Sequence, residues 1–254
     1  MPRFFVRKDQ IADGFVTLTG DDAHHISRSL RMAAGERITV CDMQKFEYEC
    51  ELTDFLSDCV RARILQTTHS DTEPPYRAML FQALPKGDKL DSVIQKAVEC
   101  GVSEITTFES ERCIVRAKDG SEEKKVERRK RIALEAAKQC GRGIVPDVHA
   151  TMSFRQAIEQ ASRADISLFC YEGDGTESLS AVLKKSRAQI PSGEIPTVSI
   201  VIGSEGGFSQ AEAAAAVAAG MAPIGLGKRI LRTETAAAFV LACLVYELEL
   251  TEES

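Results

Sequence analysis

The chain has 254 residues, of which 44% are hydrophobic and 28% are charged. This composition is typical of soluble globular proteins and excludes a disordered or fibrous chain. The formal net charge of −6 argues weakly against nucleic-acid binding over the whole surface, and no run approaches the roughly 18 uninterrupted apolar residues of a membrane span.

The cysteines and histidines give no sign of a metal site. All eight cysteines stand singly, no CxxC occurs, and only four histidines are present, whereas zinc sites show paired ligand spacing. The first ten residues, MPRFFVRKDQ, lack the apolar core and cleavage site of a signal peptide. We therefore expect a cytoplasmic protein with reduced thiols and no metal.

Residues 1–70 have the pattern of a small β-barrel, because short strands alternate with turns at spacings of 8–12 residues. One helix is expected among them, at 21–35, and the polar segment 71–76 contains two prolines that suggest a linker. The expected strands are residues 4–8, 15–19, 36–43, 46–55 and 60–68.

Residues 77–254 alternate between strands and helices, and this order predicts an α/β domain with a mainly parallel sheet. The expected strands are residues 77–84, 102–110, 166–172, 197–203 and 222–227. The expected helices are residues 89–101, 121–141, 151–163, 178–187, 209–220 and 235–250.

Charge is unevenly distributed along the chain. Residues 77–142 carry 15 basic and 11 acidic side chains, a net of +4, whereas residues 143–254 carry 8 and 14, a net of −6. A local excess of basic residues on an acidic protein is what an RNA-facing surface requires. A solvated helix with many lysines explains part of the same pattern equally well.

Two glycine-containing loops, 203–208 and 226–235, each follow a strand and each hold a glutamate. Such loops lie at the carboxyl edge of a parallel sheet, where ligands bind. The first loop resembles a dinucleotide loop, but the fingerprint GxGxxG is absent and the loop lies late in the domain, which argues against a Rossmann fold. From the residues alone the prediction is a ligand-binding α/β enzyme, with acyl or methyl transfer left open.

These loops also carry a family resemblance. IGSEGGFS (202–209) followed by LGKRILRTETAA (226–237) resembles the signature pair of SPOUT-class RNA methyltransferases, and more closely that of the ribosomal small-subunit RNA methyltransferase E family. Three further segments agree: QKAVECGVSEITTFESERC (95–113), AAKQCGRGIVPDV (136–148) and HHISRSLRMAAGE (24–36). Two departures are Ser204, where the family usually has proline, and Lys228.

The resemblance implies a trefoil-knotted methyltransferase domain at 77–254, preceded by a PUA-like RNA-binding β-barrel at 1–70. It further implies S-adenosylmethionine as cofactor, methylation of N3 of a uridine in 16S ribosomal RNA of the small subunit, and a homodimer through the knotted domain. The cofactor-binding residues it implies are Tyr171, Glu172, Ile202, Gly203, Glu205, Gly206, Gly207, Leu226, Gly227, Ile230, Leu231 and Thr235.

Basic residues are the candidates for RNA contacts, because phosphate contacts position a nucleic acid without reading its sequence. The candidates are Arg3, Arg7, Arg28, Arg31, Lys86, Lys89, Arg112 and Arg142.

Arg232 and Glu234 are the catalytic candidates. Removing the proton from a ring nitrogen leaves negative charge on the flanking carbonyl oxygens, and a fixed cation such as Arg232 stabilises it. Glu234 could orient Arg232 through a bidentate pair or act as a base. Two other classes stay open: a nicotinamide-linked oxidoreductase, which would need the missing fingerprint, and a non-catalytic RNA-binding module, in which a charged pair would have no use.

Overall fold

The computed structural model describes residues 1–116, 122–191 and 193–251. The chain divides into two compact units. The first contains Met1–Glu73 together with Ala137–Val145, and the second contains Pro74–Ala136 and Pro146–Ser254.

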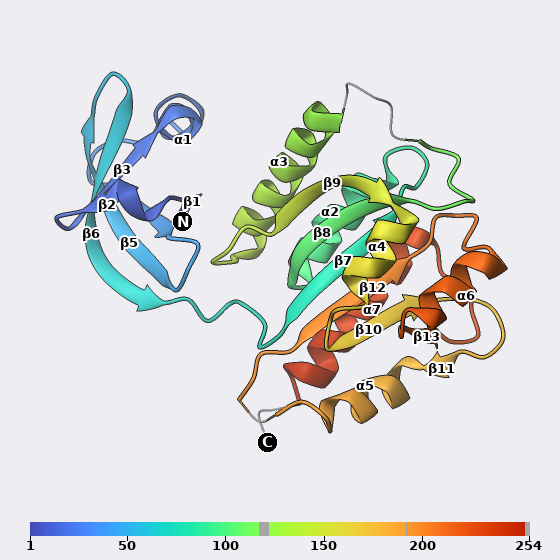
Figure 1. Cartoon of the computed structure of the whole chain (residues 1–254). Helices are drawn as coiled ribbons and strands as arrows, with labels where there is room; N and C mark the ends of the chain where they lie inside the picture. The colour runs from blue at the N-terminus through green and yellow to red at the C-terminus, as the bar shows by residue number, and fades with distance from the viewer. Residues whose placement is uncertain (117–121, 192, 252–254) are drawn as a thin grey trace. The chain divides into compact units, whose positions relative to one another are not determined.

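The first unit is built on a six-stranded sheet. Its strands are β1 (Arg3–Phe5), β2 (Ile11–Ala12), β3 (Phe15–Thr19), β4 (Arg37–Cys41), β5 (Phe46–Phe55) and β6 (Cys59–His69). They lie in the order β1-β4-β5-β6-β3-β2, and all neighbours run antiparallel except β1 and β4. Figure 1 shows β5 and β6 as the long strands of this unit. Each of the five expected strands has a counterpart, although the one expected at 4–8 ends at Phe5, and β2 is additional.

Burial in the first unit follows the period of two that a half-buried strand requires. In β3, Val16 and Leu18 are buried, while Thr17 between them is partly exposed. Ile38 and Val40 do the same in β4, so the inward faces of these strands form one apolar core.

The single helix expected at 21–35 is wrong in its extent. The structure has α1 (Gly20–His24) followed by a π-helical turn, His25–Ser29. The Ser27 hydroxyl donates to the carbonyl of Ala23 at 2.7 Å, and such back-bonding competes with regular helix geometry. Arg31 then adopts a positive φ of 53°, which a continuing right-handed helix does not allow. A 3-10 turn, Lys8–Gln10, lies earlier in the unit.

Ala137–Val145 joins the first unit through polar contacts. The amide of Gly143 donates to Thr72 Oγ1 at 3.0 Å and to Glu73 Oε1 at 3.1 Å. The Arg142 guanidinium pairs with the same carboxylate. Thr72 and Glu73, which lie in the segment expected to be a linker, are therefore held by defined hydrogen bonds.

The second unit contains a seven-stranded sheet in which every paired neighbour is parallel, in the order β11-β13-β10-β12-β7-β8-β9. Its strands are β7 (Arg77–Ala83), β8 (Val102–Glu109), β9 (Asp147–Ser153), β10 (Ile166–Cys170), β11 (Glu177–Ser178), β12 (Thr197–Ile202) and β13 (Ala222–Gly225). The expected α/β fold with a parallel sheet is confirmed.

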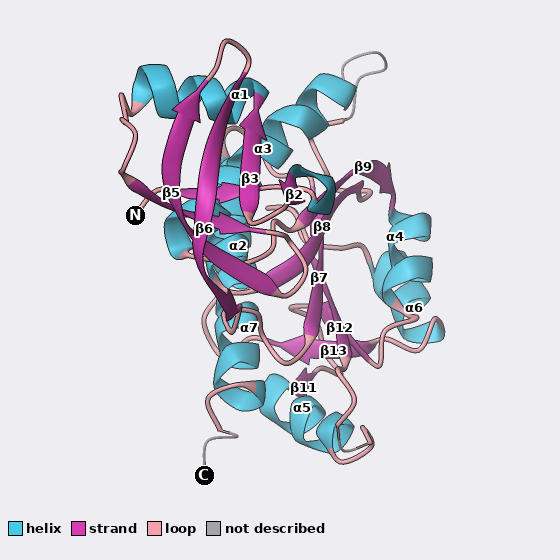
Figure 2. Ribbon diagram, turned by 90° about the vertical axis from the view of Figure 1, so that its left-hand side faces the viewer, coloured by secondary structure: helices cyan, strands magenta, loops and turns pink. Residues whose placement is uncertain are grey.

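Helices cover both faces of this sheet. They are α2 (Lys89–Glu99), α3 (Glu122–Cys140), α4 (Phe154–Ala161), α5 (Leu179–Arg187), α6 (Gln210–Ala218) and α7 (Thr233–Leu248). Figure 2 shows α2 and α7 on one side of the strands and α4 and α6 on the other. The first residue of the helix expected at 121–141 lies outside the described residues.

Two strands of this sheet, β9 and β11, were not expected, and the helix expected at 151–163 begins only at Phe154. β9 pairs with β8 alone at the edge of the sheet, and only Val148 of its seven residues is buried. An edge strand with so little burial has no apolar alternation in its sequence, so periodicity could not reveal it.

Candidate active site

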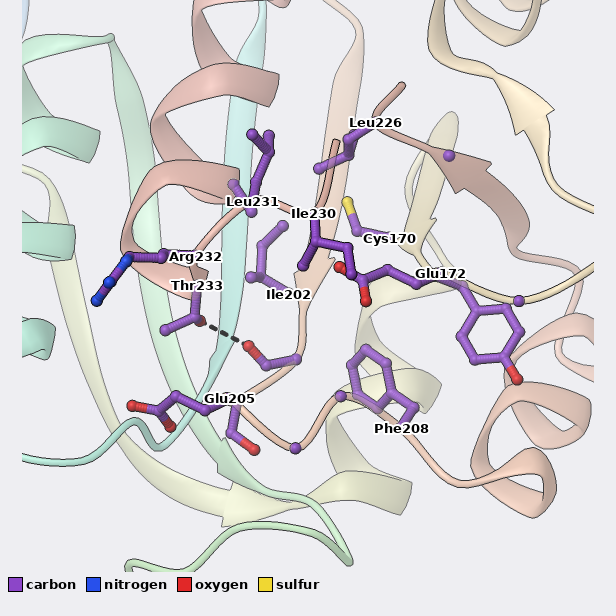
Figure 3. A pocket seen from close by; sticks show the side chains of 18 of the residues that line it. Cys170, Glu172, Ile202, Glu205, Phe208, Leu226, Ile230, Leu231, Arg232 and Thr233 are labelled. Atoms are coloured by element: carbon purple, nitrogen blue, oxygen red, sulfur yellow. Dashed lines mark hydrogen bonds between the residues drawn. The ribbon is translucent and has the colours of Figure 1, made fainter. Parts of the chain in front are cut away.

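A cavity of about 790 Å³ opens in the second unit where three parallel strands end (Figure 3). Its walls come from the segments that follow β10, β12 and β13. Because β10 lies between β12 and β13 in the sheet, their carboxyl ends are adjacent, and segments far apart in the sequence line one hollow. This is the position at which open α/β sheets bind ligands.

Two positions of the first loop, residues 203–207, favour glycine, one because of close packing and one because of its backbone conformation. A Cβ on Gly206 would lie 2.9 Å from Cβ of Arg112 and 3.0 Å from its carbonyl oxygen, which is too close for any side chain. Gly207 has a φ of +63°, a conformation that costs glycine little. Its amide donates to the carbonyl of Ser204 at 2.9 Å and closes the turn. The loop can therefore present backbone groups to the cavity.

The second loop, residues 226–232, connects β13 to α7. Gly227 has a φ of +100°, and Ile230 is 83% exposed although it is apolar. An exposed isoleucine beside a cavity gains stabilisation only when something covers it. The loop therefore offers apolar surface to a ligand.

Polar contacts fix the acidic residue of the first loop. Glu205 Oε1 accepts from Lys89 Nζ at 2.7 Å and from the amide of Lys86 at 3.1 Å. Partial burial alone would raise the pKa of Glu205, but these hydrogen bonds outweigh it and lower the pKa. Glu205 is therefore ionised at neutral pH and holds its loop against the start of α2.

Positive charge predominates around the cavity. Its lining includes five cationic side chains, those of Lys89, Arg112, Lys228, Arg229 and Arg232, against the two carboxylates Glu172 and Glu205. The protein as a whole carries −6, so the cavity is a local cationic site on an acidic chain. Such a field raises the local concentration of an anionic partner.

The two catalytic candidates occupy different positions. Arg232 lines the cavity, is exposed, and precedes the first turn of α7 as its N-cap. Glu234 is half-buried, and its Oε2 accepts no hydrogen bond from any residue that the structure describes. Within that part of the chain the two side chains form no ion pair, and Glu234 is not in the cavity wall.

Eleven of the twelve residues implied to bind a cofactor line the cavity, and Thr235, exposed on α7, does not. Among the basic candidates, Lys89 and Arg112 line it as well. Arg112 Nη1 donates to the carbonyl of Gly206 at 3.1 Å, so this arginine supports the first loop directly.

The remaining basic candidates are distributed over both units. Arg7, Arg28, Arg31 and Lys86 are exposed, and Arg28 lines a shallow hollow of the first unit together with His24 and His25. Arg142 is only 5% exposed and its guanidinium pairs with Glu73. Arg3 pairs with Glu47 at 2.6 Å. Arg3 and Arg142 are therefore both engaged in ion pairs within the first unit.

Three further residues at or beside the site were not among the predicted site residues, although Phe208 lies in the motif at 202–209. Phe208 lines the cavity and packs against Phe169 with ring centroids 4.4 Å apart. Cys170 lines it too, and burial raises the pKa of its thiol, which keeps the thiol protonated at neutral pH. Gln82, fully buried at the end of β7, donates a hydrogen bond to Thr233. Cys170 and Gln82 are revealed only by their place in the folded sheet.

Metal-binding clusters and membrane-spanning helices are both absent from residues 1–116, 122–191 and 193–251. These ranges contain no group of three or more His, Cys, Asp or Glu side chains that could hold a metal ion. None of their helices has the length and apolar character needed to cross a membrane.

Two protein-family models match the chain. The RNA methyltransferase domain matches residues 72–245, and the RNA methyltransferase PUA domain matches residues 18–55. A relative from Bacillus subtilis (strain 168), called Ribosomal RNA small subunit methyltransferase E, is 34% identical over 253 residues, 98% of each protein. The protein of that name from Mesomycoplasma hyopneumoniae (strain 232) is 33% identical, over 95% of this chain and 97% of the relative.

Solved structures resemble the chain over the same length. The crystal structure of a Ribosomal RNA small subunit methyltransferase E from Neisseria gonorrhoeae, bound to S-adenosyl methionine, has a TM-score of 0.81 at 30% identity and covers 97% of both chains. A putative methyltransferase from Legionella pneumophila, in complex with the bound cofactor SAM, has a TM-score of 0.82 at 28% identity over 96% of both chains.

Proposed function

The chain belongs to the ribosomal RNA small subunit methyltransferase E family, and on that premise we propose that it methylates N3 of a uridine in 16S ribosomal RNA, with S-adenosylmethionine as methyl donor. The observation that carries the proposal is the cavity that three strand ends share, because it gathers eleven of the twelve residues implied to bind the cofactor.

The residues of the cavity fit S-adenosylmethionine. Its volume of about 790 Å³ lies within the range of roughly 300–1,000 Å³ that small-molecule sites occupy. Ile202, Leu226 and Leu231 line it with apolar side chains suited to an adenine ring. The close packing at Gly206 leaves backbone groups to bind the polar parts of the cofactor. When bound, the cofactor supplies a methyl group activated by a sulfonium.

Arg232 is the proposed catalytic cation. Uracil N3 carries a proton at neutral pH, and when that proton is lost to solvent water, negative charge spreads onto the two carbonyl oxygens beside N3. A guanidinium within hydrogen-bond reach of these oxygens stabilises the charge most in the transition state. Arg232 is exposed in the cavity wall and forms no ion pair with any described residue. Its guanidinium is therefore available to bind the carbonyl oxygens of the uracil ring.

Glu234 is proposed to orient Arg232 in the complex with substrate. Its Oε2 is buried without a hydrogen-bond donor among the described residues, and a buried acceptor left unpaired is costly. A guanidinium two residues away in sequence would satisfy it. This favours an orienting role over that of a base, because Glu234 is not in the cavity wall.

The proposal also covers the architecture that the family implies. The family resemblance implies a trefoil knot in which α7 would pass through the chain near the second loop. Phe239 and Tyr246 on α7 are 40% and 65% exposed, which supports a homodimer through the second unit. The first unit would act as a PUA-like RNA-binding barrel in a cytoplasmic enzyme, as the match at residues 18–55 suggests.

Calorimetry with S-adenosylmethionine and, separately, NADH tests the cofactor assignment. We expect saturable binding of the first and none of the second. Binding of NADH alone would favour the oxidoreductase. A protein that binds ribosomal RNA but neither cofactor would be a non-catalytic RNA-binding module.

A further inference from the structure

The two loops of the cavity are joined by one buried chain of hydrogen bonds. The hydroxyl of Thr233, in the first turn of α7, donates to the carbonyl of Gly203 at 2.6 Å, the bond drawn in Figure 3. The same hydroxyl oxygen accepts from Gln82 Nε2 at 2.9 Å. The first loop begins at Gly203 and the second ends next to Thr233, so this chain of bonds sets the distance between them.

Gln82 is placed to act only through its neighbours. It is 0% exposed at the end of β7, in register with Ile202 of β12, and it is not in the cavity wall. Its Nε2 also lies 3.0 Å from the carbonyl of Ala83 and 3.4 Å from that of Gly203. These carbonyl oxygens can only accept, so the amide presents its N–H groups to the loops.

Stability alone does not explain a glutamine at this position. Its Oε1 is buried and has no hydrogen-bond partner among the described residues, and an unpaired buried acceptor is destabilising. An apolar side chain of similar length would fill the space without that penalty. Residues with a buried polar group that lacks a hydrogen-bond partner are found mainly at functional sites.

We propose that Gln82 is a positioning residue that, through Thr233 and the Gly203 carbonyl, locks the two cofactor loops into the arrangement that binds S-adenosylmethionine. The inference deepens the proposed function and rests on it for the identity of the ligand. The hydrogen bonds from Gln82 to Thr233 and from Thr233 to Gly203 are present in the free protein. Their effect on the loops can therefore be measured without any ligand.

Four substitutions distinguish a positioning role of Gln82 from a contribution to general stability. Gln82→Met keeps the length of the side chain and removes both donors. Thr233→Val keeps the shape and removes the hydroxyl, whereas Thr233→Ser keeps the hydroxyl. Ser199→Ala is the matched control, because Ser199 is fully buried in β12 and donates to the carbonyl of Ala161 at 2.7 Å, away from the loops.

Hydrogen exchange in the free protein is the first measurement. The amides of Gly207, Thr235 and Ala236 donate to Ser204 and Arg232 and report on the two loops. Gln82→Met and Thr233→Val should speed exchange at all three by about tenfold, the effect of losing one buried hydrogen bond. Thr233→Ser and Ser199→Ala should leave these three rates within about twofold of the parent rates.

Affinity for S-adenosylmethionine, measured by calorimetry, is the second readout. Gln82→Met and Thr233→Val should each weaken binding by about tenfold, and the double variant should be little worse than either, as expected for residues acting as one unit. Unchanged exchange at both loops in a folded Gln82→Met protein would overturn the inference, as would full additivity of the two changes. A parent protein that does not bind S-adenosylmethionine would refute the proposed function instead. The exchange rates would still decide whether Gln82 and Thr233 hold the two loops together.

Discussion

Arg232 is the cation of the cavity that sits at the start of α7, and like Arg112, Lys228 and Arg229 it has no ionic partner among the described residues. Lys89, by contrast, is already neutralised by Glu205. A cation that a protein leaves unpaired beside a cavity is available to a ligand, which is why the proposed chemistry depends on this side chain.

Arg232→Ala should lower kcat by about 10²–10³-fold, the usual loss when one donor that stabilises transition-state charge is removed. Affinity for S-adenosylmethionine should stay within a few fold, since the guanidinium is assigned to the uracil. Transfer of labelled methyl groups to small ribosomal subunits measures the first quantity, and calorimetry measures the second. Arg163→Ala, which removes a surface arginine paired with Glu159, controls for net charge. A tenfold weaker cofactor complex with unchanged kcat would assign Arg232 to binding.

Gly206 and Ser204 provide a matched pair within the first loop. Gly206→Ala would place a methyl group 2.9 Å from Cβ of Arg112, so the loop must move, at a cost of about 1–3 kcal/mol in the free energy of unfolding, and cofactor affinity should fall. Ser204→Ala should be neutral or stabilising, because the Ser204 hydroxyl is buried without a hydrogen-bond partner among the described residues. Urea unfolding and calorimetry on both variants test this, and equal effects would contradict it.

At the scale of elements, the sequence predicted the part of the site that depends on local pattern. Buried strands such as β12 have long apolar runs, and a glycine loop after a parallel strand indicates a ligand site, so the two glycine loops that line the cavity were predicted from pattern. Other lining residues, such as Tyr171 and Glu172, were named from the family resemblance. Gln82 was not found, because its contact with Thr233 spans 151 residues and arises only when α7 packs against β7. β9 was missed because an edge strand buries too little to show a period of two.

The weakly patterned β9 is held to α3 by an ionic network. Glu122 Oε1 accepts from the Thr151 hydroxyl at 2.6 Å, the Thr151 amide at 2.9 Å and Arg129 Nη1 at 3.0 Å. Burial would raise the pKa of Glu122, but these contacts outweigh it and lower the pKa. Its ionised form is therefore bound more favourably in the folded state than in the unfolded chain.

Glu122→Gln should lower the free energy of unfolding at pH 7 by about 1–3 kcal/mol, since it weakens a largely buried network. A carboxylate whose folded pKa is depressed stabilises fully above its unfolded pKa of about 4.3, and that contribution disappears as pH falls through the lower folded value. The difference between parent and variant should therefore shrink below about pH 4.

Urea unfolding at pH 7 and pH 3 measures this difference. Glu123→Gln, an exposed neighbour on the same helix, removes the same charge and should have little effect at either pH. If the difference in free energy of unfolding between the parent and Glu122→Gln were as large at pH 3 as at pH 7, ionisation of Glu122 would not be its source.

At the scale of the whole molecule, the chain does not divide where its sequence texture changes. Ala137–Val145 belongs to the first compact unit, where Gly143 bonds to Thr72 and Glu73. A fragment that begins at residue 77 would lack Thr72 and Glu73, which are hydrogen-bond partners of the segment Ala137–Val145. The role of the first unit is therefore better tested by point substitutions in the full chain.

Replacing Arg28 and Arg31 together with alanine should weaken RNA binding and flatten its salt dependence. For each phosphate that the protein no longer neutralises, the slope of log affinity against log salt should fall by roughly 0.7–0.9. Both side chains are exposed, so folding should be unaffected. Filter binding of 16S RNA across a salt series measures the slope, with Arg163→Ala as control. A double variant with the slope of the parent would remove these arginines from the RNA-binding surface.

The most direct test of the proposed activity is the product of the reaction. Small ribosomal subunits that lack the modification are incubated with the full chain and S-adenosylmethionine, and the 16S RNA is digested to nucleosides and analysed by mass spectrometry. We expect N3-methyluridine, formed by the parent protein and reduced by about 10²–10³-fold in rate with Arg232→Ala. A methyl group on a ribose, on another base atom or on no nucleoside at all would contradict the proposal.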